Sequence, residues 1–200
     1  MAAEKMSSVN KWRGRSVKDA ILVAASDLFY SKGIGNVGVD RIVESSDIAR
    51  GTLYKHYRGK DALISAYLEE RNRLTIEYIV NRAKKALDVN EKVGSVFDHL
   101  HDRIGLKGFR GCAFLLALAE VGDSAAVRRQ VVEHKAQVRQ IFHGILEDGA
   151  IDHASVKADL LLILYEGVLT TSASGSVVDA ARKAKNIVHV ILRDTQISPE

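Results

Sequence analysis

The stretch ARGTLYKHYRGK, residues 49–60, decides how this chain is interpreted. It holds four Lys or Arg, one His, two Tyr and two Gly. On a helical wheel at about 100° per residue, Ala49, Leu53 and Tyr57 share one face, and Gly51 lies opposite. We therefore expect the first face to pack inward and the other to present cations, hydroxyls and bare backbone.

Gly51 and Lys60 indicate what this outer face would meet. Glycine inside a helix costs about 1 kcal/mol relative to alanine, and a position facing away from the core recovers none of it by packing. Close approach of another molecule's backbone explains the glycine; the alternative is simple tolerance near a fraying helix end. Lys60 begins the next helix, where free amides and the helix dipole attract phosphate. The pattern predicts a recognition helix for the DNA major groove.

The preceding residues supply the rest of a DNA-binding head. Ser16 and Asp19 fit a capping box that opens a helix over residues 17–33. Two short helices are expected over residues 39–45 and 49–57, joined by a tight turn. Three helices in this order make a helix-turn-helix.

The segment GVDRIVESSDIARGTLYKHYRGKDALISAYL, residues 38–68, resembles the DNA-binding signature of the TetR family of bacterial transcription regulators. Gly38 and Ala49 depart from the family pattern, which has Ser or Thr as helix caps there, so Asp47 is expected to cap the third helix instead. By position, the resemblance implies two sets of DNA contacts. Base edges or nearby phosphates would be met by Arg50, Gly51, Thr52 and Lys55, and the DNA backbone by Tyr54, His56 and Lys60.

Charge placement agrees with a polyanion partner for the first third of the chain. Residues 1–60 hold 11 Lys or Arg and 6 Asp or Glu, whereas residues 61–200 hold 18 and 19. Residues 1–15 are a basic segment, interpreted as a flexible arm that either touches DNA or is a plain disordered tail.

Composition indicates a mainly helical chain in a reducing compartment. Hydrophobic residues make up 46% of the 200 residues, with a single proline, Pro199, and a single cysteine, Cys112. One cysteine excludes an internal disulfide framework. No targeting segment is visible, and the run LLLIL at residues 160–164 is too short to span a bilayer. We expect a cytoplasmic location.

Longer helices are predicted after the head, over residues 60–87, 91–104, 112–121, 124–149, 156–172 and 177–193. The predicted fold is all-α. It comprises the arm at residues 1–15, the helix-turn-helix DNA-binding domain at residues 16–62 and a larger helical domain for effector binding and dimerisation at residues 63–200.

The resemblance implies a homodimer, and the last two predicted helices support one. The helix over residues 156–172 is apolar around most of its circumference and so needs cover on two sides. A four-helix interface with a second copy would supply it, although burial within one subunit is the alternative. The predicted interface residues are Leu161, Leu164, Val168, Ala181, Ala184, Val188 and Ile191.

The resemblance also implies an effector site among the middle helices. The candidate lining residues, each of which could instead be plain core, are Phe97, His101, Cys112, Phe114, Leu115, Leu118, Phe142 and Tyr165. Few charges accompany these positions, so a largely apolar or aromatic effector is expected. Cys112, in RGCAFLLALAE, offers an alternative as a sensor of oxidants or electrophiles, since Arg110 could lower its thiol pKa; an inert buried thiol is the plainer interpretation.

No enzymatic motif accompanies these features. The sequence lacks HExxH, Walker A, GxSxG and CxxC patterns, and His99 and His101 would point to different faces of a helix. We therefore expect no catalysis, no metal and no cofactor. The predicted function is a repressor that binds a palindromic operator as a homodimer and is released by a small molecule; a DNA-binding protein without an effector is the remaining alternative.

Overall fold

The computed structural model describes residues 16–194, and this range forms nine helices and no strand. The proposed arm at residues 1–15 lies outside the described residues. The helices are α2 (Val17–Lys32), α3 (Val39–Ser46), α4 (Arg50–His56), α5 (Lys60–Ala83), α6 (Val89–Ile104), α7 (Ala113–Val121), α8 (Ala125–Asp148), α9 (Ala154–Ser174) and α10 (Ala180–Arg193). The predicted all-α fold is confirmed. None of these helices is long and apolar enough to cross a membrane.

Side-chain caps fix the starts of three helices. The Ser16 hydroxyl accepts a hydrogen bond from the Asp19 amide at 3.1 Å and donates one to the Asp19 carboxylate at 2.7 Å, so the predicted cap of α2 is present. Asp88 and Ser124 cap α6 and α8 in the same way. Gly33 ends α2 with φ of 90°, a conformation that side chains disfavour.

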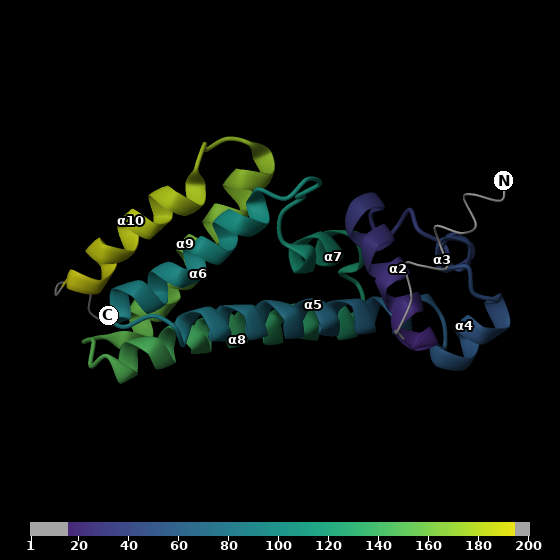
Figure 1. The fold of residues 1–200 in the computed structure, drawn as a ribbon, viewed down its shortest axis with the longest axis horizontal. Coiled ribbons are helices and arrows are strands. Elements are labelled where there is room, and N and C mark those ends of the chain that lie inside the picture. The colour runs from purple at the N-terminus through teal and green to yellow at the C-terminus, as the bar shows by residue number, and fades with distance from the viewer. Residues whose placement is uncertain (1–15, 195–200) are drawn as a thin grey trace.

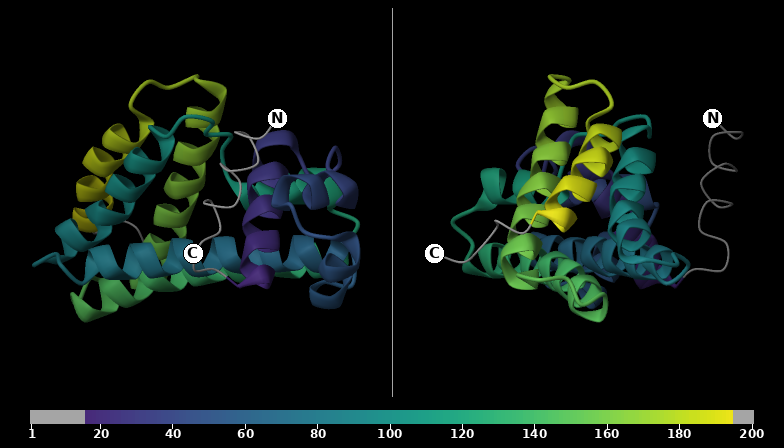
Figure 2. Two further views of the ribbon diagram at one scale, coloured as in Figure 1. Left: turned by 45° about the vertical axis from the view of Figure 1, so that its right-hand side comes forward. Right: turned by 90° about the vertical axis from the view of Figure 1, so that its left-hand side faces the viewer.

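Helices α5 and α8 run side by side along the length of the molecule (Figure 1). Helices α2, α3 and α4 occupy one end, α6, α9 and α10 the other, and α7 lies between them. The two further views show α9 and α10 rising from the α5–α8 pair on the side away from the head (Figure 2). Helix α4, predicted to be the recognition helix, therefore lies at an extremity of the molecule.

Two hydrophobic cores meet along α5 and α8. The head core joins α2–α4 to the start of α5, to α7 and to the start of α8, through residues such as Leu63, Tyr67 and Phe114. The body core joins the later halves of α5 and α8 to α6, α9 and α10. Cys112 packs against both cores. The boundary at residue 62 stays a prediction, because residues on both sides of it share one core.

Polar contacts fasten the end of α2 to the segment around α7. The Tyr30 hydroxyl accepts a hydrogen bond from the Arg110 amide at 2.9 Å and donates one to the Gly111 carbonyl oxygen at 3.0 Å. The Arg110 guanidinium donates to the Tyr30 carbonyl oxygen at 2.6 Å. Glu120, near the end of α7, accepts from the Gly35 amide at 2.8 Å. A movement of α7 would therefore act directly on α2 and the loop that follows it.

Candidate functional site

The inner face of α4 is largely as predicted. Leu53 and Tyr57 are buried, at 0% and 5% exposure, and the Tyr57 hydroxyl donates to the Lys18 carbonyl oxygen at 3.3 Å. Ala49 is exposed, contrary to the wheel, because it is the N-cap residue with extended backbone and lies outside the helical repeat. These contacts set the orientation of α4 against α2.

The turn between α3 and α4 corrects one prediction. Asp47 does not cap α4; it ends α3 in the left-handed conformation, with φ of 55° and ψ of 36°. Asp tolerates this conformation better than most residues, and the turn requires it there. Gly38 and Ala49 precede α3 and α4 without a side-chain cap, in keeping with their departure from the family pattern.

The outer face of α4 is open. Arg50, Tyr54, Lys55 and His56 are exposed. A Cβ added at Gly51 would meet no atom within 4 Å. Of the other two predicted DNA-contacting residues, Thr52 lies on α4 and Lys60 begins α5, and both are partly exposed. No described part of the chain therefore fills the space beyond Gly51.

An ion pair orients the cation at the start of α4. The Arg50 guanidinium lies 2.8 Å from the Asp40 carboxylate of α3 and 5.9 Å from the centre of the Tyr54 ring. Tyr54 and Asp40 raise the pKa of Arg50 above its ordinary value. Both partners of the ion pair are exposed, so DNA can compete with Asp40 for this cation.

A small cavity lies where the two cores meet. Its volume is about 30 Å³. Its lining comes from α5, α6, α7, α8, α9 and the loop before α7, and consists of Arg71, Thr75, Arg103, Gly111, Cys112, Ala113, Phe114, His134, Tyr165 and Leu169. Next to it, Lys135 binds Glu166 at 2.5 Å and lies 3.2 Å from the Cys112 sulfur.

A second cavity of about 170 Å³ opens between α5 and α8. Phe114 and His134 line both cavities, and their rings stack with centres 3.7 Å apart and planes 5° apart. His134 Nδ1 lies 2.7 Å from the Asn72 side-chain oxygen. Burial, Lys135 and Arg103 lower the pKa of His134 to about 3, so the ring is neutral at physiological pH.

The head and the body together match known regulators. The family profile "Bacterial regulatory proteins, tetR family" matches residues 21–67. SCO4454, a TetR-family transcriptional regulator from Streptomyces coelicolor, is 30% identical, with a TM-score of 0.82 and coverage of 90% of this chain and 96% of that one. The chain belongs to the TetR family.

Two more distant regulators resemble this chain, one in its structure and one in its sequence. FadR from Bacillus subtilis, solved with stearoyl-CoA, is 16% identical, with a TM-score of 0.69 and coverage of 87% of this chain and 97% of that one. SrpR, a helix-turn-helix regulator from Pseudomonas putida, is 19% identical over 175 residues, which cover 87% of this chain and 79% of that one. As a TetR-family member, the chain is a DNA-binding transcriptional regulator with an N-terminal helix-turn-helix domain and a helical C-terminal domain.

Only part of the predicted effector lining comes together in this TetR-family body. Cys112, Phe114 and Tyr165 line the 30 Å³ cavity. The other five predicted residues lie elsewhere: Phe97 and Phe142 in the body core, Leu118 against the head core, Leu115 exposed on α7 and His101 at a cavity between α6 and α10. Helical periodicity identified these side chains as apolar or inward, but it does not say which of them leave space between them.

Most of the predicted dimer residues lie in the hydrophobic core of the single chain. Leu161, Val168, Ala181, Ala184 and Val188 are at most 3% exposed in the single chain and belong to its own body core. Leu164 and Ile191 pack partly buried against the same core. Helices α9 and α10 pack these faces against each other and against α6 and α8. Leu164 and Ile191 keep part of their surface exposed, so their place in a dimer interface stays a prediction.

Sequence reasoning missed the polar residues that line the 30 Å³ cavity between the two cores, which we call the central cavity. Arg71, Thr75 and Arg103 lie on α5 and α6 among many other charged or polar side chains, and no spacing distinguishes them. His134 lies on α8, and no motif distinguishes it either. Their common position depends on the packing of α5, α6 and α8, which no local pattern encodes.

Proposed function

We propose that this TetR-family regulator is a homodimeric repressor that binds a palindromic operator through α4 and is released by a small-molecule effector. The uncovered outer face of α4 carries the proposal. Gly51 leaves free space beyond the helix, and exposed cations and hydroxyls surround it. Such a surface matches the dimensions and chemistry of a major groove.

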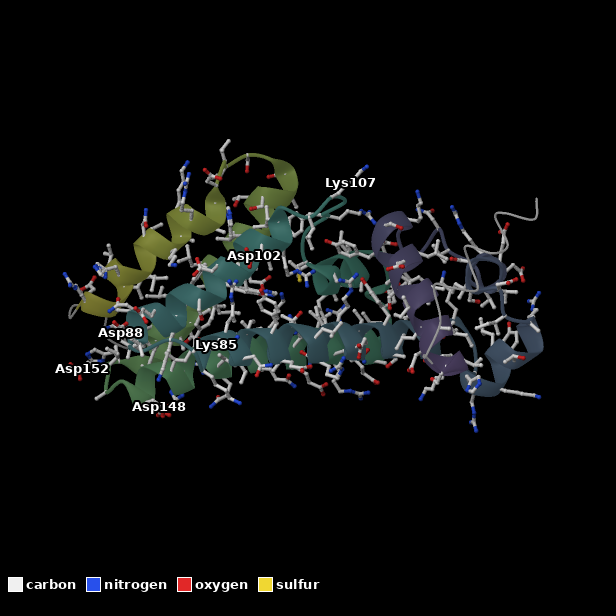
Figure 3. The ribbon with its side chains drawn as sticks, viewed as in Figure 1. Lys85, Asp88, Asp102, Lys107, Asp148 and Asp152 are labelled. Atoms are coloured by element: carbon white, nitrogen blue, oxygen red, sulfur yellow. The ribbon has the colours of Figure 1, made fainter. Side chains whose placement is uncertain are left out.

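The phosphate contacts supply the direct test. Tyr54→Ala or Lys60→Ala should weaken binding to every DNA duplex, and Lys60→Ala should reduce the slope of log affinity against log salt by about 0.9. Fluorescence anisotropy with a labelled duplex at several salt concentrations measures both effects. Lys85, exposed in the turn just after α5 (Figure 3), is the matched control, and Lys85→Ala should leave binding unchanged. Equal affinities for Lys60→Ala and Lys85→Ala would contradict the proposed interface.

Exposed apolar residues on the last two helices support the homodimer. Ile163 on α9 is 66% exposed, and Ile187 and Val190 on α10 are 46% and 64% exposed. An added Cβ at Gly167, one turn after Ile163, would meet nothing within 4 Å, so a partner helix could approach there closely. These faces replace the buried residues first predicted. In a symmetric dimer, the two α4 helices would enter successive major grooves about 34 Å apart.

The boundary between the head core and the body core, which we call the seam, supports release of DNA controlled by a ligand. The central cavity touches α7, whose Glu120 binds the Gly35 amide of the head. FadR, with the same fold, holds stearoyl-CoA, which fits a regulator that responds to small molecules. Binding at the seam would favour one arrangement of head and body, with coupling of about 1–3 kcal/mol. We propose that the chain acts by binding and not by catalysis.

A second candidate function is sensing of electrophiles or oxidants through Cys112. The observation favouring it is the Lys135 ammonium, which donates a hydrogen bond to the Cys112 sulfur at 3.2 Å. Treatment with N-ethylmaleimide would then release the wild type from DNA and leave a Cys112→Ser variant bound. Release of both proteins, or of neither, would exclude this function.

A further inference from the structure

The central cavity is lined by polar groups that make no hydrogen bond to the described part of the chain. Thr75 and Tyr165 are 7% and 3% exposed, and neither hydroxyl has a hydrogen-bond partner within residues 16–194. His134, 3% exposed, uses Nδ1 for Asn72, and its Nε2 makes no hydrogen bond to any described residue. Buried polar groups are normally paired. The Thr75 and Tyr165 hydroxyls and His134 Nε2 are not among the fully buried unpaired atoms, so they face space that water or a polar ligand can reach.

Two arginines give this cavity a positive charge. Arg71 from α5 and Arg103 from α6 both line it. Within the described part of the chain, neither guanidinium has a carboxylate oxygen within 4.0 Å. The nearest acid on α9, Glu166, is already paired with Lys135. Two partly buried, unpaired guanidinium groups favour an anion, and their planar donors suit a carboxylate.

The buried groups around the cavity experience this positive charge. Burial lowers the pKa of His134, and the charge of Arg103 lowers it further. Burial raises the pKa of Tyr165 and of the neighbouring Tyr67, and the charges of Arg103 and Arg71 act against these two increases.

The remaining walls suit a small apolar body. Phe114, Tyr165 and Leu169 supply two aromatic rings and one aliphatic side chain. The stacked rings of Phe114 and His134 separate the 30 Å³ cavity from the 170 Å³ cavity, so rotation of this pair would join the two. A cavity of about 150 Å³ holds benzene in other proteins. The joined space would therefore accept a molecule with one ring.

We propose that the effector is an organic carboxylate with one aromatic ring or an equally small apolar body, its carboxylate bound by Arg71 and Arg103 and its body packed against Phe114. This inference rests on the proposed function and specifies the ligand class at the same seam. It adds an anionic group to the largely apolar or aromatic effector expected from the sequence, because the two unpaired arginines could not be recognised there.

The same arginine links the ligand to the head. The Arg71 guanidinium lies 4.6 Å from the centre of the Tyr30 ring, which belongs to α2. The Tyr30 hydroxyl binds the Arg110 amide and the Gly111 carbonyl oxygen. A carboxylate that draws Arg71 into the cavity would weaken this contact between ring and cation. Ligand binding would thus directly weaken a contact that holds α2 against α5.

The test uses the purified full-length protein with matched acids and amides. The probes are benzoate, phenylacetate and hexanoate, each paired with its primary amide, and the measurement is isothermal titration calorimetry. At least one acid should bind about tenfold or more tightly than its amide, since charge-assisted hydrogen bonds are lost in the amide. Amides that bind as tightly as the acids, or three acids that fail to bind, would overturn the proposal. This comparison needs no variant.

Substitutions locate the binding groups. Arg71→Gln and Arg103→Gln should each weaken acid binding by about tenfold or more, and Arg103→Lys should weaken it less, because the charge remains. The exposed Lys107, in the loop after α6 (Figure 3), provides the control Lys107→Gln, which should bind normally. Circular dichroism confirms that each variant is folded. Full acid affinity in Arg103→Gln would refute the site.

The proposed ligand class and the proposed DNA-binding surface can be refuted independently. DNA binding by the same preparations is measured without acid and depends on Lys60 if the proposed function holds. If that dependence remains while the acids fail, only the ligand class is wrong. If acids bind through the arginines but Lys60→Ala leaves DNA affinity unchanged, the ligand class stands and the DNA-binding surface is wrong.

Discussion

The Tyr30 hydroxyl gives the sharpest prediction about how the head is held. Tyr30→Phe removes one oxygen that both accepts from the Arg110 amide and donates to the Gly111 carbonyl oxygen, at 2.9 and 3.0 Å. The aromatic ring stays, and so does its contact with Arg71. The substitution therefore isolates two hydrogen bonds between α2 and the segment before α7.

Each of these bonds joins neutral, partly buried groups, so each contributes about 0.5–1.5 kcal/mol. Tyr30→Phe should lower the free energy of unfolding by about 1–3 kcal/mol. With a urea m-value of about 2 kcal/mol/M, the midpoint should fall by about 0.5–1.5 M. Urea unfolding followed by far-ultraviolet circular dichroism measures the shift, at one fixed protein concentration because a dimer's stability depends on concentration.

Tyr165→Phe is the matched control. Its hydroxyl is buried but has no hydrogen-bond partner among the described residues, so its removal should leave the midpoint nearly unchanged or raise it. If Tyr30→Phe and Tyr165→Phe unfold at the same urea concentration, the two hydrogen bonds do not hold the head, and the proposed route from ligand to DNA loses its support.

Three further predictions test other parts of the molecule. Both ring nitrogens of His99 are buried without partners, and burial lowers its pKa to about 4. Stability should therefore fall as pH drops from about 6.5 towards 4, with His99 contributing about 2 kcal/mol at pH 5 and His134, whose pKa is about 3, a similar amount. His99→Phe should reduce the fall by the share of His99 only, and a pH profile identical to the wild type would contradict this assignment. Ile163→Asp should convert a dimer of twice 21.9 kDa into a monomer by light scattering, whereas an unchanged mass would exclude this face of α9. Gly33→Ala should lower the free energy of unfolding by about 1–3 kcal/mol, because φ is 90° at this position and the added Cβ would lie 2.9 Å from a Glu120 carboxylate oxygen. Gly51→Ala should raise the free energy of unfolding by about 0.5–1 kcal/mol and weaken DNA binding. Equal stability changes in the two variants would refute both assignments.

The DNA-binding head could be predicted because its information is local. The spacing of Leu53 and Tyr57, the cap at Ser16 and the cations of α4 all lie within short stretches whose helical repeat fixes their directions. The error at Asp47 arose because the same residue type favours both helix starts and left-handed helix ends, and the error at Ala49 arose because the helix begins one residue later than the wheel assumed.

The body could be predicted only as a set of helices. An apolar stripe shows that α9 must be covered but not by what, so Leu161 and Val168 were assigned to a partner although α8 and α10 of the same chain cover them. The pairing of Tyr30 with Gly111 joins residues 81 positions apart. Such contacts, like the meeting of Arg71 and Arg103, follow from tertiary packing alone.

The shared core of the head also bears on how such regulators could be rebuilt. Leu63, Tyr67 and Phe114 complete the hydrophobic interior beneath α2–α4. A chimera that transplants a foreign reading head onto this body at the start of α5 would leave that interior mismatched. A workable graft would have to exchange the first turns of α5 and the inner side of α7 together with the head. The exchangeable unit of this protein therefore extends beyond α2–α4 into α5 and α7.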